Sequence, residues 1–146
     1  MADRPAKPEG MSWLTPMLTV KDMRKSLDFY AEAFGFEKTL EIPGEDGNPM
    51  HAEMRYRGQS MMFGPEWPDS SSKAPANASG TTTDLYLYTD DVEGAFERAT
   101  QAGAKVLMEP KDQFWGDRAF LVQCPEGHKW MFAQNVADFD PNNVPT

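Results

Sequence analysis

The chain has 146 residues, enough for one domain whose core needs no disulfide staples. Its 23 acidic and 14 basic residues give a formal net charge of −9, which opposes binding to nucleic acid because both surfaces would be negative. The same charge favours cationic ligands, or simply keeps the surface soluble. Its one cysteine, Cys124, cannot form an internal disulfide, and no stretch is apolar enough for a signal peptide or a membrane span. These features predict a cytoplasmic protein.

The first half of the chain predicts a strand, a helix and three further strands. Residues 1–11 are polar and predict a flexible arm. Residues 13–20 alternate as a strand, with Leu14, Leu18 and Val20 on one side and Thr15, Met17 and Thr19 on the other. A helix follows, capped by Asp22 and ended by Gly35, which adopts a left-handed conformation without strain. Strands are then expected over residues 36–42, 50–56 and 60–63, separated by Gly-rich turns.

The second half repeats this order. Leu85 and Leu87 alternate with Asp84, Tyr86 and Tyr88. A helix capped by Asp91 ends at Gly103, and strands are expected over 105–108, 119–124 and 128–134. The distance from Asp22 to Gly35 is only one residue longer than the distance from Asp91 to Gly103. This internal repeat predicts two βαβββ modules, and residues 65–80 between them predict either a linker or a lid over a site.

Three stretches of the sequence carry a resemblance to a known family. They are Leu18–Met23 with Asp28-Phe29-Tyr30 and Phe34-Gly35-Phe36; Leu87–Val92 with Ala102-Gly103-Ala104; and Phe114–Arg118 with Cys124–Trp130. Together they resemble the vicinal-oxygen-chelate (VOC) superfamily, which includes glyoxalases, bleomycin-resistance proteins and dioxygenases. Pro43–Gly47, His51–Met54 and Asp112–Arg118 resemble its PhnB-like branch in order and spacing.

The resemblance implies an α+β fold in which the two modules form a curved mixed sheet around a cleft, with the helices outside. The expected organisation is an N-terminal arm over 1–11, a single VOC domain over 12–136 and a tail over 137–146. Within the domain, module one covers 12–64 and module two covers 81–136. Leu14, Leu18, Val20, Leu85 and Leu87 would then face the helices. The resemblance also implies a homodimer.

Glyoxalase-type relatives hold a divalent metal through side chains on the first and last strands of each module. The resemblance places these positions at Thr15, at Met62 or Phe63, at Asp84 and at Met131. Thioether and phenyl groups do not hold hard or borderline divalent ions, and a lone carboxylate does not make a site. We therefore expect no metal and no cofactor.

Most of the remaining candidates have aromatic or thioether side chains. They either line a ligand-binding cleft or fill a core between the modules. The candidate ligand-binding residues are Thr15, Met17, Met62, Asp84, Tyr86, Tyr88, Phe114, Trp115, Arg118 and Met131. Aromatic rings and thioethers suit a flat, partly apolar ligand, and Asp84, if buried, would call for a cationic partner. Asp117 and Arg118 follow Gly116 in what reads as an exposed loop. They could pair with neighbours, or Arg118 could hold a ligand carboxylate.

His51 and Glu53 share one face of a predicted strand, either as a ligand or proton-transfer pair or as a solvated polar surface. The sequence thus predicts metal-independent binding of a small, partly aromatic or cationic molecule. The alternatives are a metal-dependent lyase or dioxygenase, or a cofactor-free isomerase that uses His51 and Glu53.

Overall fold

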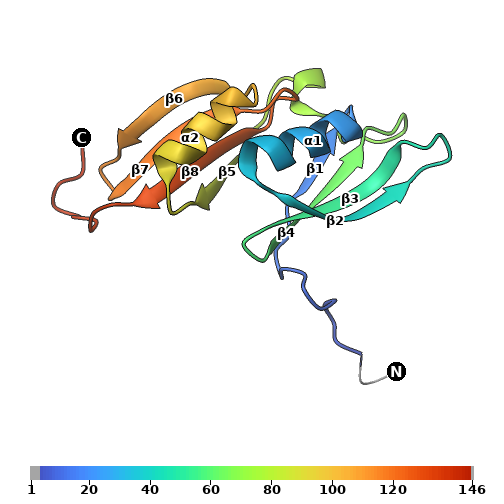
Figure 1. The fold of residues 1–146 in the computed structure, drawn as a ribbon, viewed down its shortest axis with the longest axis horizontal. Coiled ribbons are helices and arrows are strands. Elements are labelled where there is room, and N and C mark those ends of the chain that lie inside the picture. The colour runs from blue at the N-terminus through green and yellow to red at the C-terminus, as the bar shows by residue number, and fades with distance from the viewer. Residues whose placement is uncertain (1–3, 146) are drawn as a thin grey trace. The chain divides into compact units, whose positions relative to one another are not determined.

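The computed structural model describes residues 4–145, so residues 1–3 of the predicted arm and Thr146 of the predicted tail lie outside the described residues. The described chain contains the following elements in order (Figure 1): β1 (Met17–Val20), α1 (Met23–Phe34), β2 (Glu37–Pro43), β3 (Pro49–Tyr56), β4 (Gln59–Pro65), the short 3-10 helix η1 (Pro75–Asn77), β5 (Asp84–Tyr88), α2 (Val92–Gln101), β6 (Lys105–Asp112), β7 (Asp117–Gln123) and β8 (Lys129–Asn135).

Over residues 4–145 the strands form two four-stranded mixed sheets, ordered β1-β4-β3-β2 and β5-β8-β7-β6. In each sheet the first strand of the module runs parallel to the last, and the other pairs are antiparallel. The α+β class and the two βαβββ modules predicted from the internal repeat are confirmed. No helix in this part of the chain is long and apolar enough to cross a membrane.

The chain divides into two compact units. One runs as far as Ala31 and resumes over Gly35–Ala74, and the other comprises Glu32–Phe34 and the residues from Pro75 onward. The last turn of α1 belongs to the second unit. Its Phe34 ring packs with its centroid 4.8 Å from that of the Phe132 ring in β8.

Both helices begin where the sequence predicts. The Asp22 side chain accepts a hydrogen bond from the Lys25 amide at 3.0 Å, and the Asp91 side chain accepts one from the Gly94 amide at 3.0 Å. These carboxylates satisfy amides that the first turn of a helix leaves without partners. Helix α1 ends at Gly35 with φ of 74°, so the predicted left-handed cap is confirmed there.

In the first unit, alternate residues of the strands form a buried face. Leu18 pairs with Phe63 and Phe63 with Ala52 across neighbouring strands, and all three are buried. The Tyr30 ring of α1 lies 5.2 Å from the Phe63 ring on this face. Met17 points to the opposite face, where it is 66% exposed. Because side chains alternate along each strand, one face of this sheet is apolar and buried and the opposite face is exposed.

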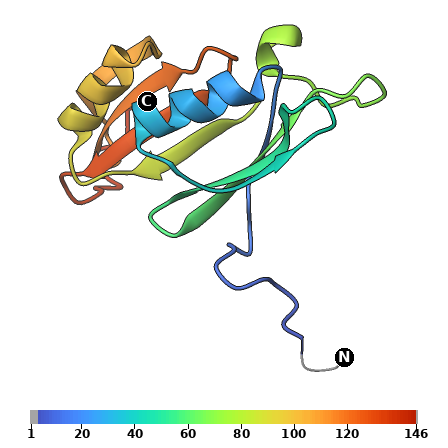
Figure 2. The ribbon, with the colours of Figure 1, turned by 45° about the vertical axis from the view of Figure 1, so that its right-hand side comes forward.

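In the second unit, α2 packs on β6, β7 and β8 (Figures 1 and 2). The rings of Phe120 and Phe132 stack at 5.2 Å beneath it, and Phe96 of α2 meets Phe120 edge-on at 5.3 Å. Because buried aromatic rings contribute most per residue to a core, this cluster fixes which face of the sheet the helix covers. The other face carries Tyr86 and Tyr88.

Two predictions about the chain around β1 and β4 are wrong. The strand expected over 13–20 begins only at Met17, and Leu14, expected to face the helix, is 87% exposed. The reason is that the side chains of Ser12 and Thr15 form hydrogen bonds with Ser60 before the strand begins. Within residues 65–80, predicted as a linker or a lid, Ala74 and Pro75 are buried.

Candidate functional site

The face of the second sheet opposite α2 carries exposed aromatic side chains. Tyr86 is 43% exposed and Tyr88 is 56% exposed, and the two rings meet edge-on with centroids 5.5 Å apart. Tyr86 pairs with Met131 of β8 across the ladder, which adds a thioether to the same face. Three residues predicted to line a ligand site therefore lie together.

A buried carboxylate organises these rings. Asp117, the first residue of β7, is only 2% exposed. Its Oδ2 accepts hydrogen bonds from the hydroxyls of Tyr86 at 2.6 Å and Tyr88 at 3.0 Å and from the Trp115 Nε1 at 3.2 Å. Its Oδ1 accepts one from the Asn135 Nδ2 at 3.1 Å. The carboxylate and its four donors, here called the Asp117 cluster, compensate for the burial of a charge.

The backbone around Gly116 holds Asp117 and Trp115 in place. Gly116 has φ of 102°, a conformation that favours glycine, and its carbonyl accepts hydrogen bonds from the amides of Val136 at 2.9 Å and Ala137 at 3.0 Å. An added Cβ at Gly116 would run into the Ala137 carbonyl. The tight turn therefore locks the chain just beyond β8 against the start of β7.

The hydrogen bonds set the ionisation of the Asp117 cluster. Burial raises the pKa of Asp117, but the bonds from Tyr86, Asn135, Tyr88 and Trp115 outweigh it and hold the pKa below its ordinary value of 3.8. Burial, together with the bond to Asp117, raises the pKa of Tyr86 from 10.0 to about 12. The bond to Asp117 likewise raises the pKa of Tyr88. Near neutral pH the carboxylate is therefore charged and both hydroxyls keep their protons.

The sequence missed the role of Asp117, which was expected in an exposed loop. The loop is shorter than predicted because β6 extends to Asp112 and β7 begins at Asp117. Asp117 and Arg118 do pair with neighbours, one of the two alternatives the sequence left open. The sequence feature that could have indicated this role is the order Trp115-Gly116-Asp117, taken together with the two tyrosines that alternate along the strand of Tyr86 and Tyr88.

The remaining candidates of the second unit are placed as follows. Phe114 is 46% exposed and meets the Trp115 ring edge-on at 5.1 Å, so it extends the aromatic face. Arg118 points to the opposite face, where its Nη1 donates to Asp112 at 3.1 Å and its Nε donates to Glu93 of α2. Asp84 is exposed and forms an ion pair with Lys129 at 3.3 Å. Because Asp84 is exposed and paired with a lysine, it does not call for a cationic ligand.

In the first unit, Met17 pairs with Met62 on the face opposite the buried one. Met62 pairs in turn with Glu53 of β3, whose Oε2 lies 3.1 Å from the Nε2 of His51. The structure therefore brings the predicted pair His51 and Glu53 together on the same face as the two methionines. Thr15 lies just before β1, with its Oγ1 3.1 Å from the Ser60 Oγ.

The residues at the metal positions implied by the resemblance do not fit a divalent cation. Phe63 faces the core, which leaves Met62 and Met131 as thioethers on the open faces of their sheets. Thr15 is engaged with Ser60 and Asp84 with Lys129. Within residues 4–145, no group of three or more His, Cys, Asp or Glu side chains lies close enough together to hold a metal ion.

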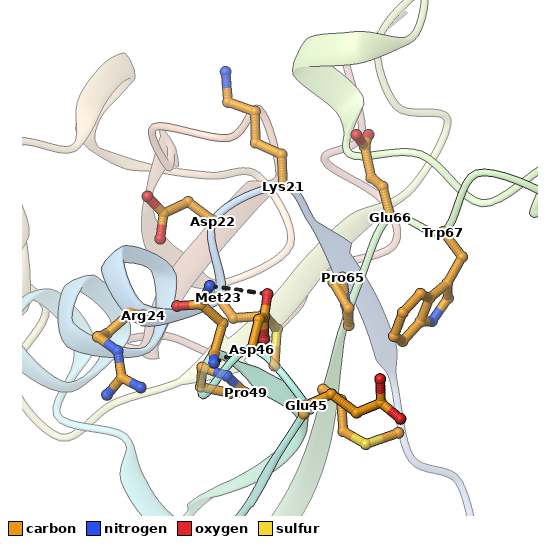
Figure 3. A pocket seen from close by; sticks show the side chains of 13 residues that line it. Lys21, Asp22, Met23, Arg24, Glu45, Asp46, Pro49, Pro65, Glu66 and Trp67 are labelled. Atoms are coloured by element: carbon orange, nitrogen blue, oxygen red, sulfur yellow. Dashed lines mark hydrogen bonds between the residues drawn. The ribbon is translucent and has the colours of Figure 1, made fainter.

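A hollow of about 830 Å³ lies in the first unit and is lined by none of the predicted site residues (Figure 3). Its walls are the start of α1, the turn between β2 and β3, and the chain leaving β4, and they include Glu45, Met50 and Trp67. This hollow could not be predicted from the sequence, because its three walls are far apart along the chain.

Comparison with known proteins agrees with the fold. Residues 11–132 match the family model of the Glyoxalase/Bleomycin resistance protein/Dioxygenase superfamily. The chain belongs to this superfamily. A curated relative, the uncharacterized protein Mb0911c of Mycobacterium bovis, is 35% identical over 90% of this chain and 88% of its own length.

Two similar solved structures extend this comparison. TioX from Micromonospora sp. ML1 is 30% identical, covers 86% of this chain and 99% of its own, and superposes with a TM-score of 0.69. TnmS3, an antibiotic binding protein from Streptomyces sp. CB03234, is 25% identical, covers 85% of this chain and 97% of its own, and has a TM-score of 0.62.

Proposed function

We propose that the protein binds a small, partly aromatic molecule without a metal ion. The observation that carries this proposal is the Asp117 cluster, which holds two exposed tyrosine rings and the Trp115 indole on one face. Rigid aromatic rings bind flat ligands at low entropic cost because little side-chain freedom remains to be lost. The antibiotic-binding relative TnmS3 supports a small-molecule role.

The same hydrogen bonds indicate which polar groups the ligand carries. The hydroxyl hydrogens of Tyr86 and Tyr88 are committed to Asp117, and the Tyr86 oxygen also accepts a hydrogen bond from the Trp115 Nε1 at 3.0 Å. Toward a ligand these oxygens can act only as acceptors, through their remaining lone pairs. The face therefore favours an aromatic ligand that bears N–H or O–H donors. A purely cationic ligand has less support, because the Asp117 carboxylate is buried and already accepts four hydrogen bonds, while Asp84 forms an ion pair with Lys129.

A thermal-shift screen of planar aromatic compounds, with and without EDTA, tests the proposal. A binder at 100 times its Kd stabilises the fold by about 2.7 kcal/mol, and we expect the same shift in EDTA. The matched variants are Tyr88→Leu, which removes the ring, and Tyr88→Phe, which removes only the hydroxyl. Leucine should weaken binding about fivefold or more, and phenylalanine should weaken most the ligands that donate a hydrogen bond.

Two outcomes would contradict the proposal. Binding that disappears in EDTA and returns with a divalent metal would show that the site needs a metal. A ligand whose affinity is the same in the native protein and in the Tyr88→Leu and Trp115→Leu variants would lie elsewhere.

A second candidate function, a cofactor-free isomerase, rests on the 3.1 Å contact between His51 and Glu53. A histidine held by a carboxylate is a common arrangement for general acid–base catalysis. Exchange of a substrate's acidic C–H hydrogens into deuterated water, lost in His51→Gln and kept in Arg57→Gln, would support it. A ligand whose hydrogens never exchange would leave binding as the function.

We further propose that the protein belongs to the PhnB-like branch and acts as a cytoplasmic homodimer. The Asp112–Arg118 stretch supports the branch, since it builds the Asp117 cluster and the Arg118 ion pairs. Light scattering of the purified protein tests the dimer, and a monomeric mass at micromolar concentration would contradict it.

A further inference from the structure

The hollow in the first unit has the dimensions and walls of a second ligand site. Its volume of about 830 Å³ falls within the range of about 300–1,000 Å³ that is common for small-molecule sites. Its apolar wall includes Pro65, the Met50 thioether and the Trp67 indole. Met50 is 43% exposed and Trp67 50% exposed, so much of this apolar surface remains in contact with water.

The Trp67 backbone is held rather than loose. The Glu66 amide donates to the Val20 carbonyl at 3.2 Å, and the Ser70 amide donates to the Trp67 carbonyl at 3.0 Å. The Glu66 side chain accepts a hydrogen bond from the Ala74 amide at 2.7 Å. A tryptophan fixed at the rim with its ring half exposed offers a ready surface for stacking, because its backbone need not be ordered on binding.

The charges around the hollow favour a cation. Four acidic residues line it, Asp22, Glu45, Asp46 and Glu66, against Lys21 and Arg24. Three of the carboxylates bond backbone amides, at Lys25, Asn48 and Ala74. Within residues 4–145, the Glu45 carboxylate forms neither a hydrogen bond nor an ion pair.

Figure 3 shows the Glu45 carboxylate on the same side of the hollow as the Trp67 indole, while the Lys21 side chain extends away from that ring. Arg24 donates from its Nη2 to the Gly47 carbonyl at 3.2 Å. The side of the hollow near Trp67 therefore combines an aromatic face, a thioether and one uncommitted negative charge.

We propose that this hollow binds an organic cation, a compact ammonium or quaternary ammonium group on a small, partly apolar body. The ammonium lies over the Trp67 ring, whose face attracts cations, and Glu45 supplies the counter-charge. Met50 and Pro65 contact the apolar body of the ligand. This site is separate from the Asp117 cluster, because all its walls belong to the first unit.

The test compares choline with 3,3-dimethylbutan-1-ol, a neutral molecule of nearly the same shape. Titrations of the full chain are followed through the tryptophan indole N–H signals in NMR spectra, with the Trp67 signal assigned from its absence in Trp67→Leu. Choline should shift the Trp67 signal and leave that of Trp115 in place. The neutral molecule should bind about threefold or more weakly, since it lacks the cation–π attraction.

Two variants and two matched controls complete the test. Trp67→Leu, followed through neighbouring backbone amides, and Glu45→Gln should each weaken choline binding about threefold or more. Trp13→Leu and Glu37→Gln make the same changes at exposed positions outside the hollow and should leave binding unchanged. Circular dichroism confirms that all four variants fold.

Three results would overturn the proposal. The neutral molecule could bind as well as choline, or the Trp67 and Trp13 variants could behave alike. Choline could also shift Trp115 and leave Trp67 unmoved. The first two results do not bear on an aromatic ligand at Tyr86 and Tyr88, and the third would place the cation at the Asp117 cluster instead, so the two proposals fail separately.

Discussion

Replacing Asp117 with asparagine removes the charge at the centre of the aromatic face and changes the side chain's shape very little. The carboxylate accepts four hydrogen bonds, three on Oδ2 from Tyr86, Tyr88 and Trp115, and one on Oδ1 from Asn135. An asparagine oxygen in the Oδ2 position keeps three of these bonds as neutral ones. Its amide group then faces the Asn135 amide, donor against donor.

These four hydrogen bonds determine how much the free energy of unfolding should fall in Asp117→Asn. A hydrogen bond to a charged group contributes about 1.5–3 kcal/mol and a neutral one about 0.5–1.5 kcal/mol, so three weakened bonds and one lost bond amount to about 4.5–7.5 kcal/mol. Relief from burying a charge offsets part of this loss, because Asp117 is only 2% exposed. We expect the free energy of unfolding to fall by about 3 kcal/mol.

Urea unfolding followed by circular dichroism measures this change, with Asp112→Asn as the control. Asp112 also accepts a hydrogen bond from a charged side chain, Arg118, but it is exposed, so water can replace its partner. The reasoning fails if the two variants lose similar stability. It also fails if Tyr86→Phe costs as much in the Asp117→Asn background as in the native protein, since coupled residues cannot be additive.

Three further predictions concern the same region. Because the folded pKa of Tyr86 is raised from 10.0 to about 12, stability held below pH 10 should be lost as the pH rises toward 12, and melting curves of Tyr86→Phe should lack much of that loss. Gly116→Ala should cost about 2–3 kcal/mol in urea unfolding because φ is 102° and the new Cβ meets the Ala137 carbonyl. Arg118→Gln should leave affinity for an aromatic ligand unchanged in calorimetry, and a loss would mean that Arg118 reaches the ligand.

The modules could be predicted because each rests on local signals. Asp22 and Asp91 cap helices that are preceded and followed by alternating strands, and a capped, amphipathic pattern that occurs twice defines the same unit twice. Tyr86 and Tyr88 were assigned to one face by period-two alternation alone. These inferences need no knowledge of contacts between distant residues.

The parts that failed depend on distant contacts. Leu14 alternates in step with Leu18, but Ser60, far along the chain, draws the segment around Ser12 and Thr15 out of the strand. Asp117 reads as a surface residue because nothing in its neighbourhood shows that Tyr86 and Tyr88 will reach it. Side-chain networks of this kind become visible only when strands are placed beside one another.

The alternation of Asp117 and Arg118 along β7 limits how this chain can change its length. Asp117 organises the aromatic face, while Arg118 fastens Glu93 of α2 and Asp112 on the opposite face. Inserting or deleting a single residue just before Asp117, so that β7 shifts its register by one, would exchange the faces of every side chain in the strand. Such a change would send a carboxylate toward the helix and a guanidinium toward the tyrosines. Surviving variants of this stretch should therefore differ by substitution and not by length.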